Sequence, residues 1–324
     1  MKFGLYLDVR NPSSEVTWAR RYSETLELCE AMESLGADSV WLTEHHRFPD
    51  GYLPQPLVFA AAIAARTRRV RIGTAVLLAP LRHTMHIAEE AAVVDILSDG
   101  RLDLGIGAGY LPYEFEMFDS VVDRPFLRMF QQVEELREIF RTRAITPVPV
   151  QQPLPVWVGS QGVGGAKRAG LIGAPLLSIR RDQVQPYIDG FVDGGHDVSA
   201  ARMSGVVNIF LSDDPERDRA EVLRAYGYLW DTYAAAAVEG SGKTVNAPAD
   251  LDEALRLGLA GGTNGLTIAT PAVAARLLSE YVEGMPVETV YSWADLPGIP
   301  AAVRDRHIEL WVTELPRLMT GVSR

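Results

Sequence analysis

Residues 70–78 (VRIGTAVLL), 86–98 (HIAEEAAVVDILS) and 102–107 (LDLGIG) decide the fold. The first and third of these segments are short and nearly continuously apolar, which is typical of strands buried on both faces of a parallel sheet. The middle segment has the length of a helix, and Asp99-Gly100 after it is a turn signal. A strand, a helix and a second strand in this order predict a parallel βαβ unit.

The same alternation continues in both directions along the chain. We expect strands at residues 2–8, 38–44, 70–78, 102–107, 155–160, 174–179, 205–212 and 289–294. We expect helices at residues 15–35, 57–67, 86–98, 125–141, 164–171, 184–194, 215–237, 270–283 and 301–319. Eight strand candidates, mostly followed by helices, predict an α/β fold of the (β/α)8 TIM barrel type rather than a doubly wound sheet.

The domain organisation follows from the same pattern. Residues 239–250 are rich in Gly, Ser, Asn and Pro and indicate a loop. Residues 238–268 therefore predict an insertion between the seventh and eighth units of the barrel. We interpret residues 1–324 as one barrel domain, and a chain of two domains is the alternative.

Composition excludes several classes of function. The chain has 324 residues, 42 acidic and 31 basic, and a net charge of −11, which argues against nucleic acid or an anionic membrane as the main partner. A phosphate-bearing cofactor stays compatible with this charge. No apolar run approaches the ~18 residues of a membrane span, so we expect a cytoplasmic protein. Cys29 is the one cysteine, which excludes a disulfide framework.

The second predicted strand ends in Glu44-His45-His46. In a barrel the active site lies where strands end, so His45 is a candidate general base, and a structural histidine that bonds a loop is the alternative. Adjacent histidines on a strand point to opposite sides. With no H-x-x-x-H or C-x-x-C pattern in support, we predict no metal site.

The third and fourth strands end in further candidates. Arg82 and His83 are positioned to contact an anion or a cofactor, or alternatively to cap their own loop. Gly105, Gly107 and Gly109 lack the spacing of a dinucleotide-binding G-x-G-x-x-G motif. Glycines at this point instead let a flat ligand approach the backbone.

The fifth strand is followed by a glycine-rich turn at residues 159–165. Such a turn at a helix N-terminus presents backbone N–H groups to an anion, and Ser160 can add a hydroxyl group. No Gly-Lys-Ser/Thr follows, so this is not a Walker loop. Phosphate binding and a plain tight turn both stay open at this point.

Taken in order, these segments resemble the bacterial luciferase-like, flavin-dependent monooxygenase family. The resemblance covers residues 1–180 well and is most specific over residues 39–110, whereas residues 181–268 match in pattern alone. The matching segments are Met1-Lys2-Phe3-Gly4, residues 39–46, 70–76, 82–83, 88–90, 95–101 and 105–107, Pro155-Val156-Trp157-Val158 and Ala269-Thr270-Pro271.

This resemblance implies a barrel that binds reduced FMN at the carboxyl ends of its strands, where the flavin and dioxygen oxygenate a small organic substrate. It assigns His45 to the chemistry as a base or hydrogen-bond partner. It also implies a cis peptide bond between Ala75 and Val76, beside the flavin ring, and a phosphate contact at Ser160. The cofactor-binding residues expected on this basis are Glu44, Thr74, Ala75, Val76, His83, Gly107, Ser160, Gly162 and Val163.

The chain departs from the luciferases at the phosphate. They carry an arginine where this chain has Ala108, and a hydroxyl residue where it has Val163. Arg180 or Arg181, after the sixth strand, is a candidate replacement. Some relatives with the same barrel bind a 5-deazaflavin coenzyme and transfer hydride without oxygen, but the Glu44-His45-His46 run favours FMN. A non-catalytic flavin-binding barrel is a third hypothesis.

Two partners are expected besides substrate and dioxygen. No nicotinamide-binding fingerprint is present, so we expect a separate flavin reductase to supply reduced FMN. Residues 57–65 (LVFAAAIAA) are apolar nearly all round, which predicts a homodimer built on the helices after the second and third strands, with burial under the chain's own insertion as the alternative. Tyr226, Trp230 and Tyr233, at helical spacing, either face the substrate pocket or pack in the core.

Overall fold

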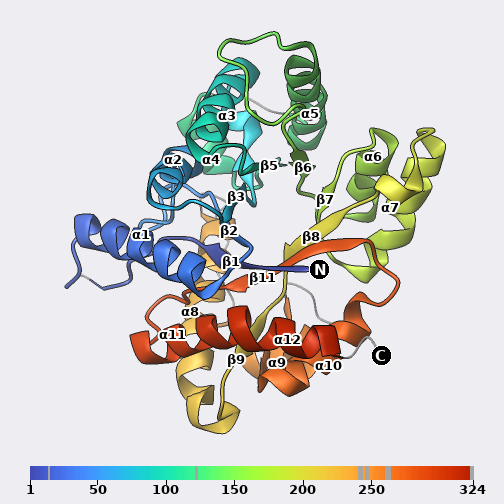
Figure 1. The fold of residues 1–324 in the computed structure, drawn as a ribbon. Coiled ribbons are helices and arrows are strands. Elements are labelled where there is room, and N and C mark those ends of the chain that lie inside the picture. Colours follow the sequence, from blue (N-terminus) through green and yellow to red (C-terminus); the bar gives the residue numbers. More distant parts are fainter. Residues whose placement is uncertain (14, 121–122, 240–243, 245–247, 260–263, 322–324) are drawn as a thin grey trace.

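Figure 1 shows the computed structural model of the chain, in which parallel strands form a closed barrel. The structure describes residues 1–13, 15–120, 123–239, 244, 248–259 and 264–321. Strands pair around the ring in the order β3, β2, β1, β11, β8, β7, β6, β5 and β4, and the pairing of β5 with β3 closes it. The barrel strands are β1 (Lys2–Leu7), β2 (Ser39–Leu42), β3 (Arg71–Thr74), β4 (Leu77–Leu78), β5 (Leu102–Gly107), β6 (Val156–Val158), β7 (Leu176–Leu177), β8 (Met203–Val206) and β11 (Val287–Trp293).

The third predicted strand consists of two pieces, β3 and β4, on either side of Ala75 and Val76. Counting them together, the described part of the chain has the eight barrel positions of the predicted (β/α)8 TIM barrel. The peptide bond between Ala75 and Val76 is cis, as the resemblance implies.

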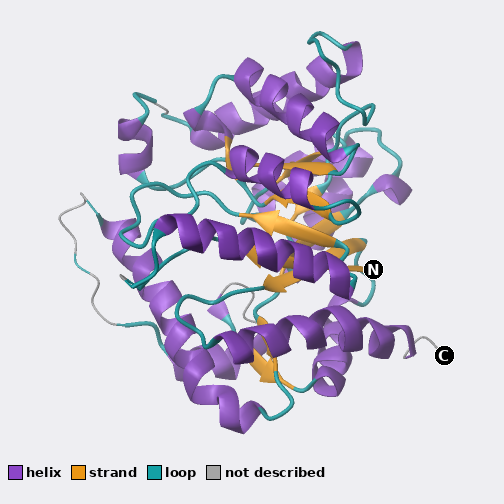
Figure 2. Cartoon of the chain, turned by 60° about the vertical axis from the view of Figure 1, so that its left-hand side comes forward, coloured by secondary structure: helices purple, strands orange, loops and turns teal. Residues whose placement is uncertain are grey.

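Helices surround the strands, as Figure 2 shows. They are α1 (Trp18–Leu35), α2 (Pro56–Arg66), α3 (Thr84–Ser98), α4 (Pro112–Met117), α5 (Pro125–Thr142), α6 (Val163–Leu171), α7 (Arg181–Asp193), α8 (Pro215–Val238), α9 (Leu251–Leu257), α10 (Pro271–Val282), α11 (Ala301–Glu309) and α12 (Leu315–Gly321). A π-helical turn at Leu310–Glu314 joins α11 to α12, and 3-10 turns lie at Ala79–Leu81 and Val198–Ala200. Within the described residues, none of these helices has both the length and the apolar character needed to cross a membrane.

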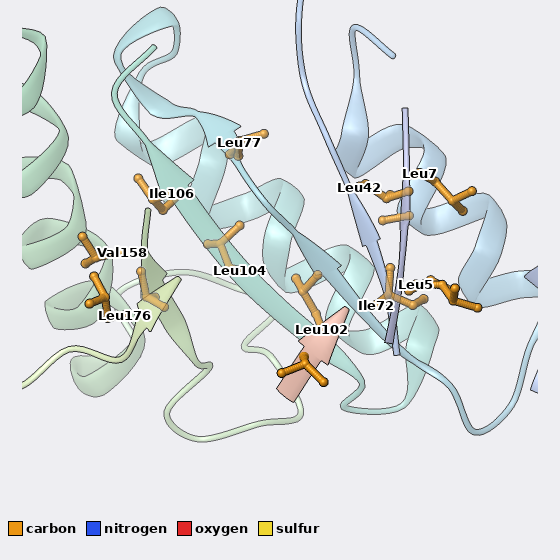
Figure 3. Packing of buried hydrophobic residues seen from close by; sticks show 14 of the residues in the cluster. Leu5, Leu7, Leu42, Ile72, Leu77, Leu102, Leu104, Ile106, Val158 and Leu176 are labelled. Atoms are coloured by element: carbon orange, nitrogen blue, oxygen red, sulfur yellow. The ribbon is translucent and has the colours of Figure 1, made fainter. Parts of the chain in front are cut away.

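The main core lies between the barrel and the helices. Alternate residues of each strand face outward into it, such as Leu102, Leu104 and Ile106 of β5, all fully buried. Figure 3 shows these side chains with their counterparts from neighbouring strands. The period of two along β5 is that of a strand whose faces contact different layers.

The interior of the barrel, unlike the core around it, is occupied mainly by aromatic side chains. Trp41, Trp157, Leu177 and Tyr291 form a buried cluster there, and glycines on neighbouring strands provide the space. A Cβ atom on Gly73 would lie 2.2 Å from the Trp41 ring. The two indole rings pack edge to face with their centroids 6.2 Å apart, a favourable aromatic geometry.

Several boundaries differ from the sequence prediction. The predicted strand 205–212 is not one barrel strand, because β9 (Ile209–Leu211) leaves the barrel and pairs with β10 (Thr267–Ala269) in a separate two-stranded sheet. The predicted helix 15–35 begins at Trp18, since Thr17 caps it by accepting a hydrogen bond from the Arg20 N–H group.

Candidate active site

A cavity of about 410 Å³ opens where the barrel strands end. Its volume is in the range of sites for small molecules and cofactors. Glu44 and His45 line it from the loop after β2, and the ends of β5, β7 and β8 with the loops that follow them contribute residues 107–110, 177–180 and 205–207. The cavity therefore lies at the barrel face that carries active sites in this fold.

His45 is held by a buried carboxylate. Its Nδ1 atom lies 3.0 Å from Oε1 of Glu114, a residue of α4 that is fully buried. The same oxygen accepts a hydrogen bond of 2.8 Å from the His46 N–H group. Oε1 of Glu114 thus acts as an acceptor, so Nδ1 of His45 is the donor, and Nε2 has no hydrogen-bond partner among the described residues.

Aromatic side chains enclose the His45 ring. The ring centroids of Phe48, Tyr52, Tyr110 and Tyr233 lie 5.1, 4.9, 5.5 and 5.6 Å from that of His45. The hydroxyl groups of Tyr52 and Tyr233 lie 2.6 Å apart and share a hydrogen bond. Burial raises the pKa of both tyrosines, so both stay protonated and neutral.

Glu44 lines the cavity, but its oxygens are bound by the protein itself. Oε1 accepts hydrogen bonds from Nε2 of His46 (2.9 Å) and from Arg82 (2.6 Å), and Oε2 accepts one from the Leu78 N–H group (2.8 Å). The two adjacent histidines therefore serve different carboxylates, since His46 bonds Glu44 and His45 bonds Glu114. Glu44 fixes the backbone after the cis peptide bond.

Ala75 and Val76 line the cavity together with Gly107. Glycines make this part of the site possible, because a Cβ atom on Gly107 or on Gly159 would lie 2.1 or 2.4 Å from a methyl carbon of Val76. Thr74 is fully buried, and its hydroxyl group bonds both the N–H and C=O groups of Gly105 at 2.8 Å. Thr74 therefore joins two strands and does not line the cavity.

The turn after β6 leads into the N-terminus of α6. Gly162 is the N-cap, and no side chain caps this end, so its first N–H groups lack helical partners. Ser160 is buried next to it, and a Cβ atom on Gly165 would lie 1.8 Å from the Ser160 hydroxyl oxygen. Val163 is exposed at the start of the helix. Gly159 and Gln161 line the cavity, whereas Ser160, Gly162 and Val163 lie outside its lining.

His83 lies apart from the other predicted residues. It is exposed and caps α3, with its Nδ1 atom accepting a hydrogen bond of 3.2 Å from the Met85 N–H group. It does not line the cavity. The two arginines proposed to replace the missing phosphate arginine differ in position. Arg180 lines the cavity and pairs with Asp182 at 2.7 Å, whereas Arg181 does not line the cavity.

A buried ion pair supports the aromatic wall from behind. Arg10 bonds Asp50 at 2.7 Å, and its guanidinium carbon lies 5.4 Å from the ring centroid of Tyr52 and 5.8 Å from that of Tyr233. Asp8 is also buried, and its hydrogen bond to the Arg10 N–H group measures 3.3 Å. Burial raises the pKa of Asp8 to about 6, although the positive charge of Arg10 partly offsets the effect.

Sequence reasoning missed Glu114. Its helix, α4, has six residues, too few for a periodic pattern to reveal, and it begins with Pro at its first position. That proline, Pro112, five residues after the end of the fourth predicted strand, is the one signal that was available. Of the three aromatic residues of α8 that the sequence offered for the substrate pocket, Tyr233 lines the cavity, whereas Tyr226 and Trp230 pack in a core cluster.

Among the described residues, no group of three or more His, Cys, Asp or Glu side chains could hold a metal ion. Comparison with known proteins identifies the kind of chain that has this site. A family model described as luciferase-like monooxygenase matches residues 1–286.

Two relatives differ in their cofactors. The chain is 30% identical over 177 residues to the flavin-dependent trigonelline monooxygenase, oxygenase component, of Acinetobacter baylyi, a match over 50% of this chain and 49% of the relative. The chain thus spans about half the length of this relative. It is 28% identical over 225 residues to an F420-dependent glucose-6-phosphate dehydrogenase of Amycolatopsis mediterranei, covering 61% of this chain and 67% of that one.

Solved structures share the fold over nearly the whole chain. The monooxygenase RslO1 from Streptomyces bottropensis superimposes with a TM-score of 0.82 at 23% identity, covering 98% of this chain and 99% of that one. The oxygenating constituent of 3,6-diketocamphane monooxygenase from Pseudomonas putida, a type II Baeyer–Villiger monooxygenase in complex with FMN, gives a TM-score of 0.77 at 15% identity, with 98% of both chains covered.

Proposed function

The chain belongs to the luciferase-like monooxygenase family, and on that basis we propose that it is the oxygenase component of a two-component, FMN-dependent monooxygenase. It takes reduced FMN from a separate reductase and uses dioxygen to oxygenate a small organic substrate. The observation that carries the proposal is the position of His45, which lines the cavity at the strand ends while Glu114 fixes its ring.

The residues present fit a flavin mononucleotide. Ala75, Val76 and Gly107 offer an apolar surface for a flat ring. Glycine is needed at Gly107 and Gly159, because a Cβ atom at either position would collide with Val76. The uncapped N-terminus of α6 next to Ser160 suits a phosphate, because its free N–H groups point outward and the helix dipole favours an anion. Arg180 lines the cavity and is our candidate for the missing phosphate arginine.

When bound, reduced FMN supplies the electrons and the site of reaction with dioxygen. The chain's own contribution is to exclude water and to hold a proton acceptor. The aromatic rings around His45 exclude water, and Nε2 of His45, which has no partner among the described residues, is the atom placed to accept a proton. We propose that this takes place within one barrel domain and in the cytoplasm.

A deazaflavin-dependent oxidoreductase is the second candidate function, because one relative is an F420-dependent dehydrogenase. A direct comparison decides between them. Purified protein is mixed with chemically reduced FMN or reduced deazaflavin under air, and dioxygen consumption is recorded against the rate without protein. Consumption that depends on substrate and on FMN supports the monooxygenase. Hydride transfer from the deazaflavin without dioxygen would overturn it.

The reductase and His45 are tested in the same assay. With NADH or NADPH and oxidised FMN we expect no product until an unrelated flavin reductase is added. With chemically reduced FMN, His45→Ala should turn over substrate on the order of 10²–10⁴ times more slowly, as is typical when a general base is lost. Unchanged turnover would remove His45 from the mechanism, and efficient NAD(P)H oxidation by the chain alone would contradict the two-component proposal.

A further inference from the structure

His45 presents one specific atom to the cavity. Nδ1 faces the buried carboxylate of Glu114, and Nε2 makes no hydrogen bond within the part of the chain that the structure describes. Because Glu114 also accepts the His46 N–H bond, the ring cannot turn without breaking a bond in a fully buried place. The ring is therefore fixed beside the cavity that His45 lines, with one ring nitrogen left for a ligand.

The surroundings of that nitrogen are aromatic and neutral. Tyr52, Tyr110 and Tyr233 present ring edges and faces to His45, and Tyr6 and Tyr291 line the cavity on its other sides. Rings prefer other rings at such distances, in stacked or edge-to-face arrangements. A planar aromatic substrate matches this shape and polarity.

The cavity next to His45 offers no free charged group that could pair with a charged substrate. Glu44 and Arg180 are the described lining residues, besides His45, that carry or readily acquire a charge near neutral pH, and each already has a partner. Arg10, behind the wall, is paired with Asp50. A substrate that is charged before it binds would thus meet no free counter-charge next to His45, and burying an unpaired charge is costly.

Building on the proposed function, we propose that the substrate is a hydroxylated arene, a phenol, whose hydroxyl group donates to Nε2 of His45, and that Glu114 is the positioning residue for this contact. In the step concerned the phenol O–H bond breaks and an N–H bond forms at Nε2, which leaves a phenolate and an imidazolium. No electrons are transferred. The carboxylate of Glu114 stabilises the positive charge of the ring, and the phenolate is more electron-rich than the phenol and therefore reacts more readily with an electrophilic oxygen donor.

A chromogenic phenol tests this proposal without any flavin turnover. 4-Nitrophenol absorbs visible light as the phenolate, so its ionisation can be read in the bound state at a fixed pH below its own pKa. We expect the wild-type chain to bind it and to raise the ratio of phenolate to phenol at least tenfold over free solution. 4-Nitroanisole, which has no acidic proton, should displace it.

Glu114→Gln separates positioning from mere packing. The amide keeps the volume of the side chain but not its charge, so the probe should still bind while the tenfold enrichment in phenolate disappears. Glu114→Asp should restore part of it. Glu138→Gln, a matched substitution on the exposed face of α5, should retain the full enrichment.

Three results would overturn the inference, namely no binding of the probe, bound probe ionised as in solution, and the same enrichment in Glu114→Gln. Circular dichroism of each variant verifies that it is folded. Dioxygen consumption with reduced FMN is measured separately, so loss of the phenolate signal with that consumption intact contradicts the phenol alone. Intact ionisation without consumption contradicts the proposed function.

Discussion

Single buried carboxylates determine much of the chemistry at the mouth of this barrel. Glu44, Glu114 and Asp8 are all removed from solvent, but they have different partners. Glu44 is neutralised by Arg82, Glu114 holds His45 through one oxygen, and the second oxygens of Glu114 and Asp8 have no hydrogen bond among the described residues. Burial raises the pKa of Asp8, which makes the stability of the chain depend on pH.

Asp8→Asn tests this dependence. The pKa of Asp8 is raised from 3.8 to about 6 in the folded chain, so its contribution to stability is present below pH 3.8 and is lost as the pH rises through 6. Relative to Asp8→Asn, the wild type should lose about 2 kcal/mol of unfolding free energy between pH 4 and pH 7. Urea denaturation at both pH values measures this difference. Parallel behaviour of the two proteins would contradict it, and Asp305→Asn, at an exposed site, is the control.

At this scale the sequence predicted which residues follow strands, but not how side chains pair. Glu44, His45 and Gly107 were expected near the site because they end strands, and Ala75 and Val76 because of the family resemblance; all five line the cavity. Contacts between residues far apart in the chain gave no signal in the sequence: His45 and Glu114 are separated by 69 positions, and Tyr52 and Tyr233 by 181. Such pairs become visible only when the barrel closes.

Among the elements, the strands β3 and β5 approach each other unusually closely. A Cβ atom on Gly105 would lie 1.9 Å from the backbone oxygen of Thr74. Backbone cannot move aside as the end of a flexible side chain can, so glycine is required on β5 for the ring to close.

Gly105→Ala should therefore destabilise the chain by about 1–3 kcal/mol or more, as is usual when a packed core is overfilled. Gly164→Ala provides a matched contrast, because a Cβ atom there meets nothing within 4 Å and the residue lies inside α6. It should be stabilising by about 0.4–1 kcal/mol. Thermal or urea unfolding of both variants measures the difference, and an equal effect at the two sites would argue against the packing explanation.

Periodicity predicted elements well where they are long, and poorly where they are short or where the partner matters. The apolar run of β5 was placed correctly at its full length, whereas the hexapeptide α4 left no pattern. β9 resembles a barrel strand in its sequence, Ile209-Phe210-Leu211, and its pairing with β10 depends on a segment more than 50 residues later. Composition does not specify such a partner.

Over the whole molecule, the outer surface of α2 and α3 differs from its surroundings. The two helices pack side by side (Figure 1), and their outward residues include exposed apolar side chains. Val58 on α2 is 70% exposed, and on α3 Leu97 is 55%, Val93 46% and Ile96 39% exposed. Exposed apolar residues on two adjacent helices suit an interaction surface, and we propose a homodimer formed through this face.

Charged substitutions test the dimer. A Val58→Glu, Leu97→Glu double variant should convert the protein from a dimer to a monomer in light scattering, because like charges would face each other across a two-fold interface. Val192→Glu is the control, since that residue is 63% exposed on α7, away from the proposed face (Figure 1). A wild-type mass equal to that of one chain, 35.6 kDa, would refute the dimer.

The tyrosines that form the wall of the cavity can be substituted more freely than the glycines on the barrel strands beneath it. Tyr52, Tyr110 and Tyr233 come from two loops and a helix outside the barrel ring, so each can be exchanged without altering how the strands pair. Gly73 and Gly105, in contrast, are fixed by indole and backbone atoms on the neighbouring strands. In a library of single substitutions, new substrate preferences should therefore arise at the tyrosines, while the glycines accumulate none. Single substitutions at these tyrosines can therefore change which substrates the cavity binds, while the pairing of the barrel strands stays the same.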